Sequence, residues 1–279
     1  MKEISCNEIT EKIRGAFLAC ACASKSASAL QRALAEEASP LGREVLSELL
    51  ENYDIAGREM VPVCQDTGMA TVFAEVGQEV HITGGAFESA VQEGVRRAYT
   101  EGYLRKSVVK DPLYERVNTG DNTPAVIHTR LISGDSIRFL CIAKGFGSEN
   151  MSRLFMLAPA EGEKGVLEAI VKAVSEAGPN PCPPVTVGVG IGGSAESAME
   201  AAKRMTACAP EYINPDPRYA ALEQKALAAV NRLGIGPGGT GGVTTALAVH
   251  IFPMPTHIAG MPVAVNICCH ALRYASAVI

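Results

Sequence analysis

The sequence has no long apolar run, no excess of basic residues and no tryptophan. No stretch approaches the roughly 18 consecutive apolar residues that a membrane-spanning helix needs, so we expect no membrane partner. Lys and Arg number 25 against 30 Asp and Glu, which gives a formal charge of -5. Such a chain has no basic field to attract phosphate backbones, and we therefore expect no nucleic-acid partner.

Nothing in the composition indicates disorder or a fibrous protein. Apolar residues make up 47% and charged residues 20% of the 279 residues, as in soluble globular proteins. A chain of this length forms one large domain or two modest ones. No repeat of fixed period is present, and the proline-rich patch Pro179–Pro184 is too short to link independent domains. We therefore expect a single structural unit over residues 1–279.

A disulfide framework is also not expected. The chain starts Met1-Lys2-Glu3-Ile4-Ser5 and continues into charged, helix-forming sequence rather than a signal peptide, which predicts a cytoplasmic protein. The cytosol keeps thiols reduced, and nine cysteines cannot all pair. Metal binding or catalysis is the alternative use of such thiols.

Helical and strand patterns alternate along the chain, and the first 60 residues are mainly helical. Ser5 and Glu8 have the spacing of a capping box, which predicts a helix over residues 6–24. Ser39-Pro40 begins another helix that we expect to stop at Gly57. Strand-like runs follow at 70–76, 125–132, 137–143, 185–191, 245–252 and 263–268, and helical patterns at 86–101, 163–177, 194–208 and 217–233.

Between the second and third of those strand-like runs, Ser133-Gly134-Asp135 predicts a hairpin turn. The whole pattern predicts a mixed α/β (α+β) fold, with a helical N-terminal segment followed by a mixed-sheet, helix-flanked domain.

Three cysteines stand in segments that could carry chemistry. Cys64 is followed by polar residues and a glycine where helical sequence gives way to strands, and loops at such points often carry reactive groups. Cys182 has prolines on both sides, which exclude a helix interior or a central strand. Cys268 and Cys269 end a strand-like run, and because adjacent side chains alternate, we expect Cys269 to face a site and Cys268 to be buried.

These three cysteines leave two metal centres open. Zinc would need a fourth ligand, such as His257 or His270, and the local two-plus-two spacing of a zinc ribbon is absent. An iron–sulfur cluster with three thiolate ligands would leave one iron open for Lewis-acid chemistry. The other cysteines lie in helix or strand patterns and are interpreted as small core residues: Cys6, Cys20, Cys22, Cys141 and Cys208.

The glycine-rich run Gly234–Gly242 resembles a phosphate loop only superficially. It lacks the Gly-Lys-Ser/Thr ending, and Pro237 interrupts any dinucleotide fingerprint. Nucleotide binding is therefore disfavoured. Backbone amides in this run could instead line an anion site, and its glycines could permit close approach to a bulky cofactor.

Several of these segments, in this order, resemble the cluster-binding part of class I fumarases, an iron–sulfur hydro-lyase family that also includes the L(+)-tartrate dehydratases. The resemblance runs from about residue 10 to the end. The matching stretches are Val63–Ala70, Val117–Pro124, Ala143–Asn150, the glycine run with Thr244-Thr245, Pro255-Thr256-His257, and Asn266–His270.

The resemblance implies a set of site residues. Cys64, Cys182 and Cys269 would bind a [4Fe-4S] cluster, in agreement with the cysteines selected above. Asp66 would be the general acid that protonates the departing oxygen. The substrate-binding residues would be Gln65, Arg105, Gly147 and His257, although Lys106 and Arg116 lie near Arg105 in the sequence.

The implied function is the reversible hydration of fumarate to L-malate, a reaction of the tricarboxylic acid cycle, by the alpha subunit of a hydro-lyase. Single-chain class I fumarases continue into a second domain, so a separate beta subunit is expected to complete the site in a dimer of heterodimers. Two alternatives stay open. One is an L(+)-tartrate dehydratase alpha subunit, and the other is a non-catalytic zinc-binding scaffold.

Overall fold

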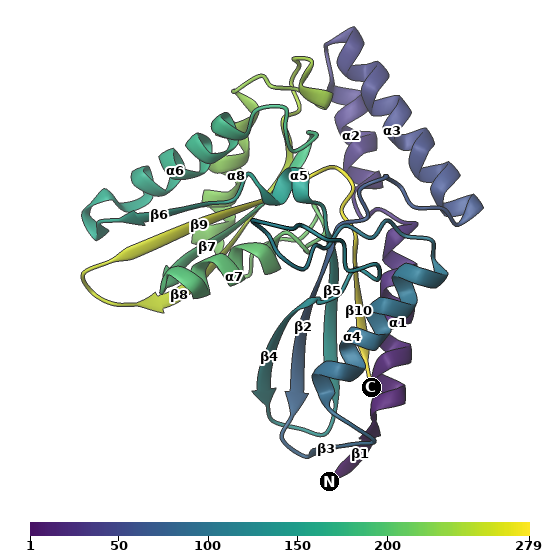
Figure 1. Ribbon diagram of the computed structural model, residues 1–279. Coiled ribbons are helices and arrows are strands. Elements are labelled where there is room, and N and C mark those ends of the chain that lie inside the picture. Colours follow the sequence, from purple (N-terminus) through teal and green to yellow (C-terminus); the bar gives the residue numbers. More distant parts are fainter. The chain divides into compact units, whose positions relative to one another are not determined.

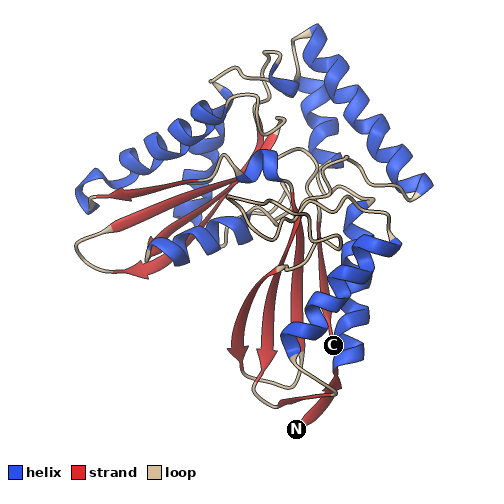
Figure 2. Cartoon of the chain, in the orientation of Figure 1, coloured by secondary structure: helices blue, strands red, loops and turns tan.

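The computed structural model describes residues 1–279 and divides into two compact units (Figures 1 and 2). Unit 1 contains Met1–Ser24, Ile55–Phe146 and Arg273–Ile279, and unit 2 contains Lys25–Asp54 and Gly147–Leu272. Helices and mixed sheets build both, which confirms the predicted mixed α/β class. The expectation of a single structural unit stays a prediction. No helix is both long and apolar enough to cross a bilayer.

Unit 1 is a four-stranded sheet with two helices on one face. The strand order is β10-β5-β2-β4, with bounds β2 Met69–Gly77, β4 Val126–Ile132, β5 Ile137–Lys144 and β10 Tyr274–Val278. The helices α1 (Cys6–Ala21) and α4 (Phe87–Glu101) pack on this sheet through a core that includes Phe17, Val72 and Phe139. The short strands β1 (Lys2–Ser5) and β3 (Val80–Thr83) form a separate parallel pair.

The capping box predicted for the first helix is confirmed. The backbone N–H of Glu8 donates to Oγ of Ser5 at 3.2 Å, and the N–H of Ser5 donates to Oε2 of Glu8 at 2.8 Å. These two bonds satisfy donors that the first turn of a helix leaves unpaired.

The predicted hairpin at Ser133-Gly134-Asp135 is wrong. β4 and β5 do not pair with each other, because β2 lies between them, parallel to β4 and antiparallel to β5. The connection instead crosses the end of β2, where the N–H groups of Gly77 and Glu79 donate to the carbonyls of Ser136 and Gly134. A tight turn therefore joins two strands that are not neighbours in the sheet.

Unit 2 is a second four-stranded sheet, with helices on both faces. Its order is β6-β9-β7-β8, with bounds β6 Arg153–Leu157, β7 Val185–Gly193, β8 Ala246–Thr256 and β9 Met261–Cys268. The helices α6 (Gly162–Ala177) and α8 (Pro217–Asn231) share one core with the sheet. The helix α7 (Ala195–Met205) packs on the opposite face through Ala198, Ala202 and Ala264 (Figure 1).

Two further helices precede this sheet in the chain. α2 (Ala27–Glu36), which the sequence analysis did not predict, lies entirely in unit 2. α3 (Pro40–Glu59) starts at Pro40 as predicted, but it continues past the expected stop at Gly57. Met60 has the positive φ, 54°, that ends the helix, and the N–H of Val61 donates back to the carbonyl of Ala56. A glycine inside a helix is tolerated, so its presence alone did not fix the end.

Candidate active site

The loop of unit 1 that carries Cys64, Gln65 and Asp66 is held from several sides. Gly68, with a φ of 77°, lies so close to the end of β5 that a Cβ there would be 2.7 Å from the carbonyl carbon of Lys144. The buried hydroxyl of Tyr99 donates to the carbonyls of Thr67 and Gly68, at 2.8 and 3.1 Å. Asn122 Nδ2 also donates to the Gly68 carbonyl, at 3.1 Å. This backbone is therefore fixed by long-range contacts.

Cys64 is half-buried, and its sulfur is within reach of two polar groups. The N–H of Asp66 donates to Sγ at 3.4 Å, and Sγ lies 3.4 Å from Oε1 of the exposed Gln65. Hydrogen bonds to the cysteine sulfurs are one of the features by which proteins tune iron–sulfur clusters. The sulfur of Cys64 is thus in a suitable environment for a metal-bound thiolate.

Asp66 is half-buried, and both of its carboxylate oxygens accept backbone hydrogen bonds. Oδ1 accepts the N–H of Gly68 at 3.0 Å, and Oδ2 accepts the N–H of Phe146 at 2.9 Å. The first bond is the local turn contact that aspartates commonly make, and the second is long-range. The side chain is therefore both a turn residue and a fixed group beside Cys64.

Arg105 belongs to the same unit. Its carbonyl accepts the hydroxyl of Thr67 at 3.1 Å, and its side chain is exposed. The structure thus links the backbone of Arg105 to the residue that follows Asp66. Its predicted contact with a substrate carboxylate stays a prediction.

In unit 2, Cys182 and Cys269 lie at the same end of the sheet. Cys182 is exposed, has a φ of 53°, and stands three residues before β7, while Cys269 is half-buried and directly follows β9. β7 and β9 are antiparallel, with Thr186 opposite Cys268, so these strand ends meet. Cys268 is 4% exposed, as the alternation predicted. The carbonyl of Cys182 also accepts the N–H of His270, at 3.4 Å.

His270 connects this end of the sheet to α2 and α3. Its carbonyl accepts Oγ of Ser26 at 2.5 Å and the hydroxyl of Tyr53 at 2.8 Å. Its Nδ1 lies 2.7 Å from the same Tyr53 hydroxyl, and the two rings are stacked. His270 therefore fixes the backbone between the segments that carry Cys182 and Cys269.

Gly147 and the glycine-rich run also lie beside the Cys182 loop. A Cβ on Gly147, in the short helix α5 (Phe146–Glu149), would be 3.5 Å from the carbonyl of Asn180. Gly238 donates its N–H to the carbonyl of Pro183 at 2.8 Å, and a Cβ on Gly239 would be 2.3 Å from Cβ of Pro179. The close approach that these glycines permit is thus to the Cys182 loop.

The carboxylate of Glu37 binds the backbone N–H groups that directly follow the glycine run. The buried carboxylate of Glu37 accepts the N–H groups of Val243 at 3.0 Å and Thr244 at 3.1 Å, and also the N–H of Ser39 at 3.0 Å. Burial alone would raise the pKa of Glu37, but these backbone donors together lower it below its usual value of 4.5. These amides, which follow the glycine run, therefore hold Glu37. The suggestion that amides within residues 234–242 line an anion site stays a prediction.

Replacing Glu37 with Gln should destabilise the protein by about 1–2 kcal/mol at pH 7, because neutral acceptors bind N–H groups less strongly than a carboxylate does. The pKa of Glu37 is lowered in the folded state, so its contribution is present above the unfolded value near 4.5 and is lost as the pH falls through the folded value. The difference in free energy of unfolding between the wild type and Glu37→Gln, measured with urea, should therefore become smaller from pH 7 to pH 3. Glu36→Gln, at the exposed neighbour, is the control. A difference independent of pH would contradict this role.

His257 lies away from the two cysteines of unit 2. It follows β8, which runs parallel to β7 with Thr256 opposite Gly193, whereas Cys182 precedes the start of β7. At about 3.3 Å per residue, the length of β7 separates these ends by roughly 20 Å or more. His257 is exposed, and its Nδ1 accepts the N–H of Ala259 at 3.1 Å. Unit 2 thus does not bring His257 next to Cys182 and Cys269, and its predicted contact with substrate stays a prediction.

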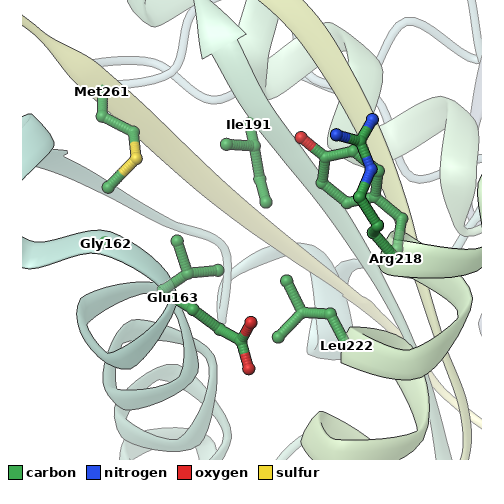
Figure 3. A pocket seen from close by; sticks show the side chains of 8 residues that line it. Gly162, Glu163, Ile191, Arg218, Leu222 and Met261 are labelled. Atoms are coloured by element: carbon green, nitrogen blue, oxygen red, sulfur yellow. The ribbon is translucent and has the colours of Figure 1, made fainter.

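A pocket of about 270 Å³ lies at this other end of the sheet (Figure 3). It is formed where α6 and α8 begin, and its walls include Val166, Ile191, Leu222 and Met261, with Glu163 and Arg218 at the two helices. None of the predicted site residues lines it. The cavity is therefore separate from the cysteine segments.

Neither unit by itself groups three or more His, Cys, Asp or Glu side chains as ligands of one metal ion. The zinc alternative therefore gains no support from the geometry. A cluster makes a different demand, since each thiolate binds its own iron. Of the three candidate cysteines, Cys182 is exposed and the other two are half-buried, and none of the nine cysteines forms a disulfide. This donor set fits a cluster with three thiolate ligands.

Comparison with known proteins identifies the family. The family model described as fumarate hydratase (Fumerase) matches residues 10–278, which include parts of both units. The chain belongs to the fumarate hydratase family. Among its relatives is a Methanocaldococcus jannaschii protein named "Putative L(+)-tartrate dehydratase subunit alpha", 37% identical over 89% of this chain and 88% of that protein.

Two relatives from Escherichia coli extend the comparison. The aerobic class I fumarate hydratase of strain K12 is 36% identical over 85% of this chain, but the match covers only 45% of that protein. The L(+)-tartrate dehydratase subunit alpha of strain UTI89 is 32% identical over 85% of this chain and 78% of that subunit. The matches thus cover 88% and 78% of the two proteins named as alpha subunits, but only 45% of the fumarate hydratase.

The sequence analysis did not predict the contacts of two buried charged residues. Glu37 and Arg273 are 3% and 2% exposed, and each holds backbone far away in the sequence. Their immediate sequence contains no motif that indicates these contacts. The only available signal was a charged residue within an otherwise apolar or small-residue segment, as in Ala271-Leu272-Arg273.

Proposed function

We propose that this chain is the alpha subunit of an iron–sulfur hydro-lyase that catalyses the reversible hydration of fumarate to L-malate. The family match over residues 10–278 carries the proposal, because it includes Asp66 and all three candidate cysteines, Cys64, Cys182 and Cys269. The relatives named above are fumarate hydratases and tartrate dehydratase subunits, whose names describe the addition or removal of water.

Cys64, Cys182 and Cys269 would hold a [4Fe-4S] cluster. The support is their exposure, the N–H of Asp66 directed at the Cys64 sulfur, and the common sheet end of the other two cysteines. When bound, a cluster with three thiolate ligands supplies an open iron position that can act as a Lewis acid.

Asp66 would deliver the proton that the hydroxyl group of malate needs in order to leave as water. Its carboxylate is held by the N–H groups of Gly68 and Phe146, which fixes the direction in which a proton could be passed. Gln65 and Arg105 would bind and orient the dicarboxylate, Arg being suited to bidentate contacts with a carboxylate. Gly147 would offer its backbone, and His257 would contribute to substrate binding if an assembly brings it to the site.

Asp66→Asn should keep the cluster but lower turnover by about 10²-fold or more, because a carboxamide cannot deliver a proton. Asn can still accept the Gly68 N–H through its oxygen, so the local turn and the fold should survive. The measurement is kcat for fumarate hydration, normalised to cluster content. Asp54→Asn, in α3, is the matched control and should leave turnover unchanged. Near-normal turnover of Asp66→Asn with a full cluster would reduce Asp66 to a turn residue.

The proposed activity is tested by purifying the chain without oxygen, together with its partner subunit. The proposal would be supported by a brown protein that absorbs at about 400 nm, as expected of thiolate-bound iron–sulfur clusters, and that has fumarate hydratase activity. A colourless protein with stoichiometric zinc would support the scaffold alternative and overturn it.

L(+)-tartrate dehydration is the second candidate function. It is favoured by the match that covers 88% of the M. jannaschii protein and 78% of the E. coli subunit. The two activities would share the cluster and the elimination chemistry and differ in how the pocket treats an extra hydroxyl group. Assays with fumarate and L(+)-tartrate on the same preparation distinguish them by the ratio of kcat/KM values.

The proposal also covers the subunit composition and the cellular compartment of the enzyme. A separate beta subunit would complete the active site, as the name subunit alpha of two relatives suggests, and the assembly would be a dimer of heterodimers. Nine cysteines without a disulfide suit a reducing, cytoplasmic compartment, where a fumarate hydratase would serve the tricarboxylic acid cycle.

A further inference from the structure

Arg273 is a buried cation in unit 1. It directly precedes β10, its side chain is 2% exposed, and its carbonyl accepts the N–H of Ala143 at 3.1 Å. An arginine stays charged at every physiological pH, and burying a charge is costly unless the charge is bonded and compensated. A side chain in this position therefore needs a reason beyond packing.

The guanidinium of Arg273 reaches the loop that carries Cys64. Its Nη1 donates to the carbonyl oxygen of Asp66 at 2.5 Å. A Cβ built on Gly145 would lie 3.3 Å from Nη2 of Arg273 and 3.3 Å from Oδ2 of Asp66, so both groups lie beside Gly145. The guanidinium and the carboxylate thus meet at one glycine, at the end of β5.

The Cys20 thiol and the Tyr99 hydroxyl also interact electrostatically with Arg273, and neither is an anion at neutral pH. Burial raises the pKa of the Cys20 thiol to about 12 and also raises the pKa of the Tyr99 hydroxyl. Neither group therefore compensates the buried cation, whereas the Asp66 carbonyl accepts a hydrogen bond from it and the Asp66 carboxylate lies beside the same glycine.

Asp66 is held through four of its atoms. Its N–H donates to Sγ of Cys64, its carbonyl accepts from Arg273, and its carboxylate accepts from Gly68 and Phe146. Arg273 also follows Cys269 by four residues in the sequence. The Arg273 side chain thus connects the segment that follows Cys269 to Asp66, whose N–H donates to Cys64.

We infer that Arg273 is a positioning residue, which fixes the Cys64–Asp66 loop so that the Cys64 sulfur and the Asp66 carboxylate keep their orientation. The inference rests on the proposed function for the roles of those two residues. Arginine suits this task better than lysine, because its planar fork can bond a carbonyl with one nitrogen while the other lies beside a second group. Loss of the guanidinium should make the Cys64–Asp66 loop more mobile without unfolding unit 1.

The test measures how fast iodoacetamide alkylates each thiol of the full-length, metal-free chain, read by mass spectrometry of the peptides. In Arg273→Met, Cys64 should react about tenfold faster or more, as loss of a charge-assisted hydrogen bond would allow, whereas Cys6 and Cys182 should change little. Arg273→Lys should recover part of the protection. Arg97→Met, which removes a surface arginine paired with Glu93 and Glu11, is the control and should leave every rate unchanged.

Gly145→Ala gives a second route if Arg273→Met does not fold. It keeps the arginine but places a methyl group 3.3 Å from both Nη2 and Oδ2, so it should accelerate alkylation of Cys64 by a smaller factor. Iron bound after anaerobic reconstitution should fall in the same order as the alkylation rates rise.

Wild-type alkylation rates for Cys64 in the folded variants would overturn the inference, as would equal acceleration at Cys6 and Cys182, which would indicate general loosening. The alkylation readout needs neither cluster nor activity. A failure of the proposed function would appear separately, as a wild-type chain that binds no cluster.

Discussion

Replacing Cys182 with Ser should leave the anaerobically purified chain without a stable [4Fe-4S] cluster, and Cys64→Ser and Cys269→Ser should do the same. Each residue would supply one of only three thiolates, so no remaining ligand can replace it. The fold should survive, because Cys182 is exposed on a loop and the other two are only half-buried. The measurement is iron and sulfide per chain together with the visible absorbance.

Two other cysteines offer matched controls for these variants. Cys6 in unit 1 and Cys208 in unit 2 are half-buried like Cys64 and Cys269, yet lie outside the proposed site. Cys6→Ser and Cys208→Ser should retain full iron content. Unchanged iron in Cys182→Ser would remove that residue from the ligand set, and loss of iron in both controls would show that the assay reports general instability.

The isolated chain, fully loaded with cluster, should hydrate fumarate negligibly until a beta subunit is added. An elimination of water needs an acid and a base placed on the substrate, and the proposed site residues of this chain include an acid but no base. The match covers only 45% of the E. coli fumarate hydratase, whereas it covers most of the proteins named as alpha subunits. Half a site can bind a cluster without turning over substrate.

A titration checks this expectation. A fixed amount of loaded chain is mixed anaerobically with increasing beta subunit, and initial rates of fumarate hydration are recorded. The rate should rise from near zero and saturate close to equal amounts of the two chains. The same titration with chain carrying Cys182→Ser should stay at background. Robust activity of the isolated chain, after host fumarase is excluded, would place the base within these 279 residues.

The open iron position of the proposed cluster also bears on the sensitivity of the enzyme to oxygen. A thiolate-bound cluster with one open iron is exposed to oxidants wherever substrate can enter, and its thiols must stay reduced in order to bind iron again. The accessible sulfurs of Cys64, Cys182 and Cys269 agree with a site that exchanges with its surroundings. In contrast, Cys20 and Cys141 are buried, and burial raises the pKa of both thiols.

The sequence by itself determined features that depend on neighbours along the chain. The capping box of Ser5 and Glu8, the start of α3 at Pro40 and the alternation that buries Cys268 were all predicted, because their contacts join residues a few positions apart. The mixed α/β class followed from the same periodicities. The family resemblance added the site residues, as several unrelated segments occurred in one order.

The tertiary structure decided what depends on residues far apart in sequence. The turn at Ser133–Asp135 was recognised, but only strand pairing showed that β2 separates β4 from β5. The hydrogen bonds of Glu37 with Val243 and of Arg273 with Asp66 each join segments more than 200 residues apart. His257 follows a strand just as Cys269 does, yet β8 and β9 run in opposite directions, so the two residues leave the sheet at opposite ends. Strand direction and long-range pairing are set by packing of the whole sheet, and no local pattern records them.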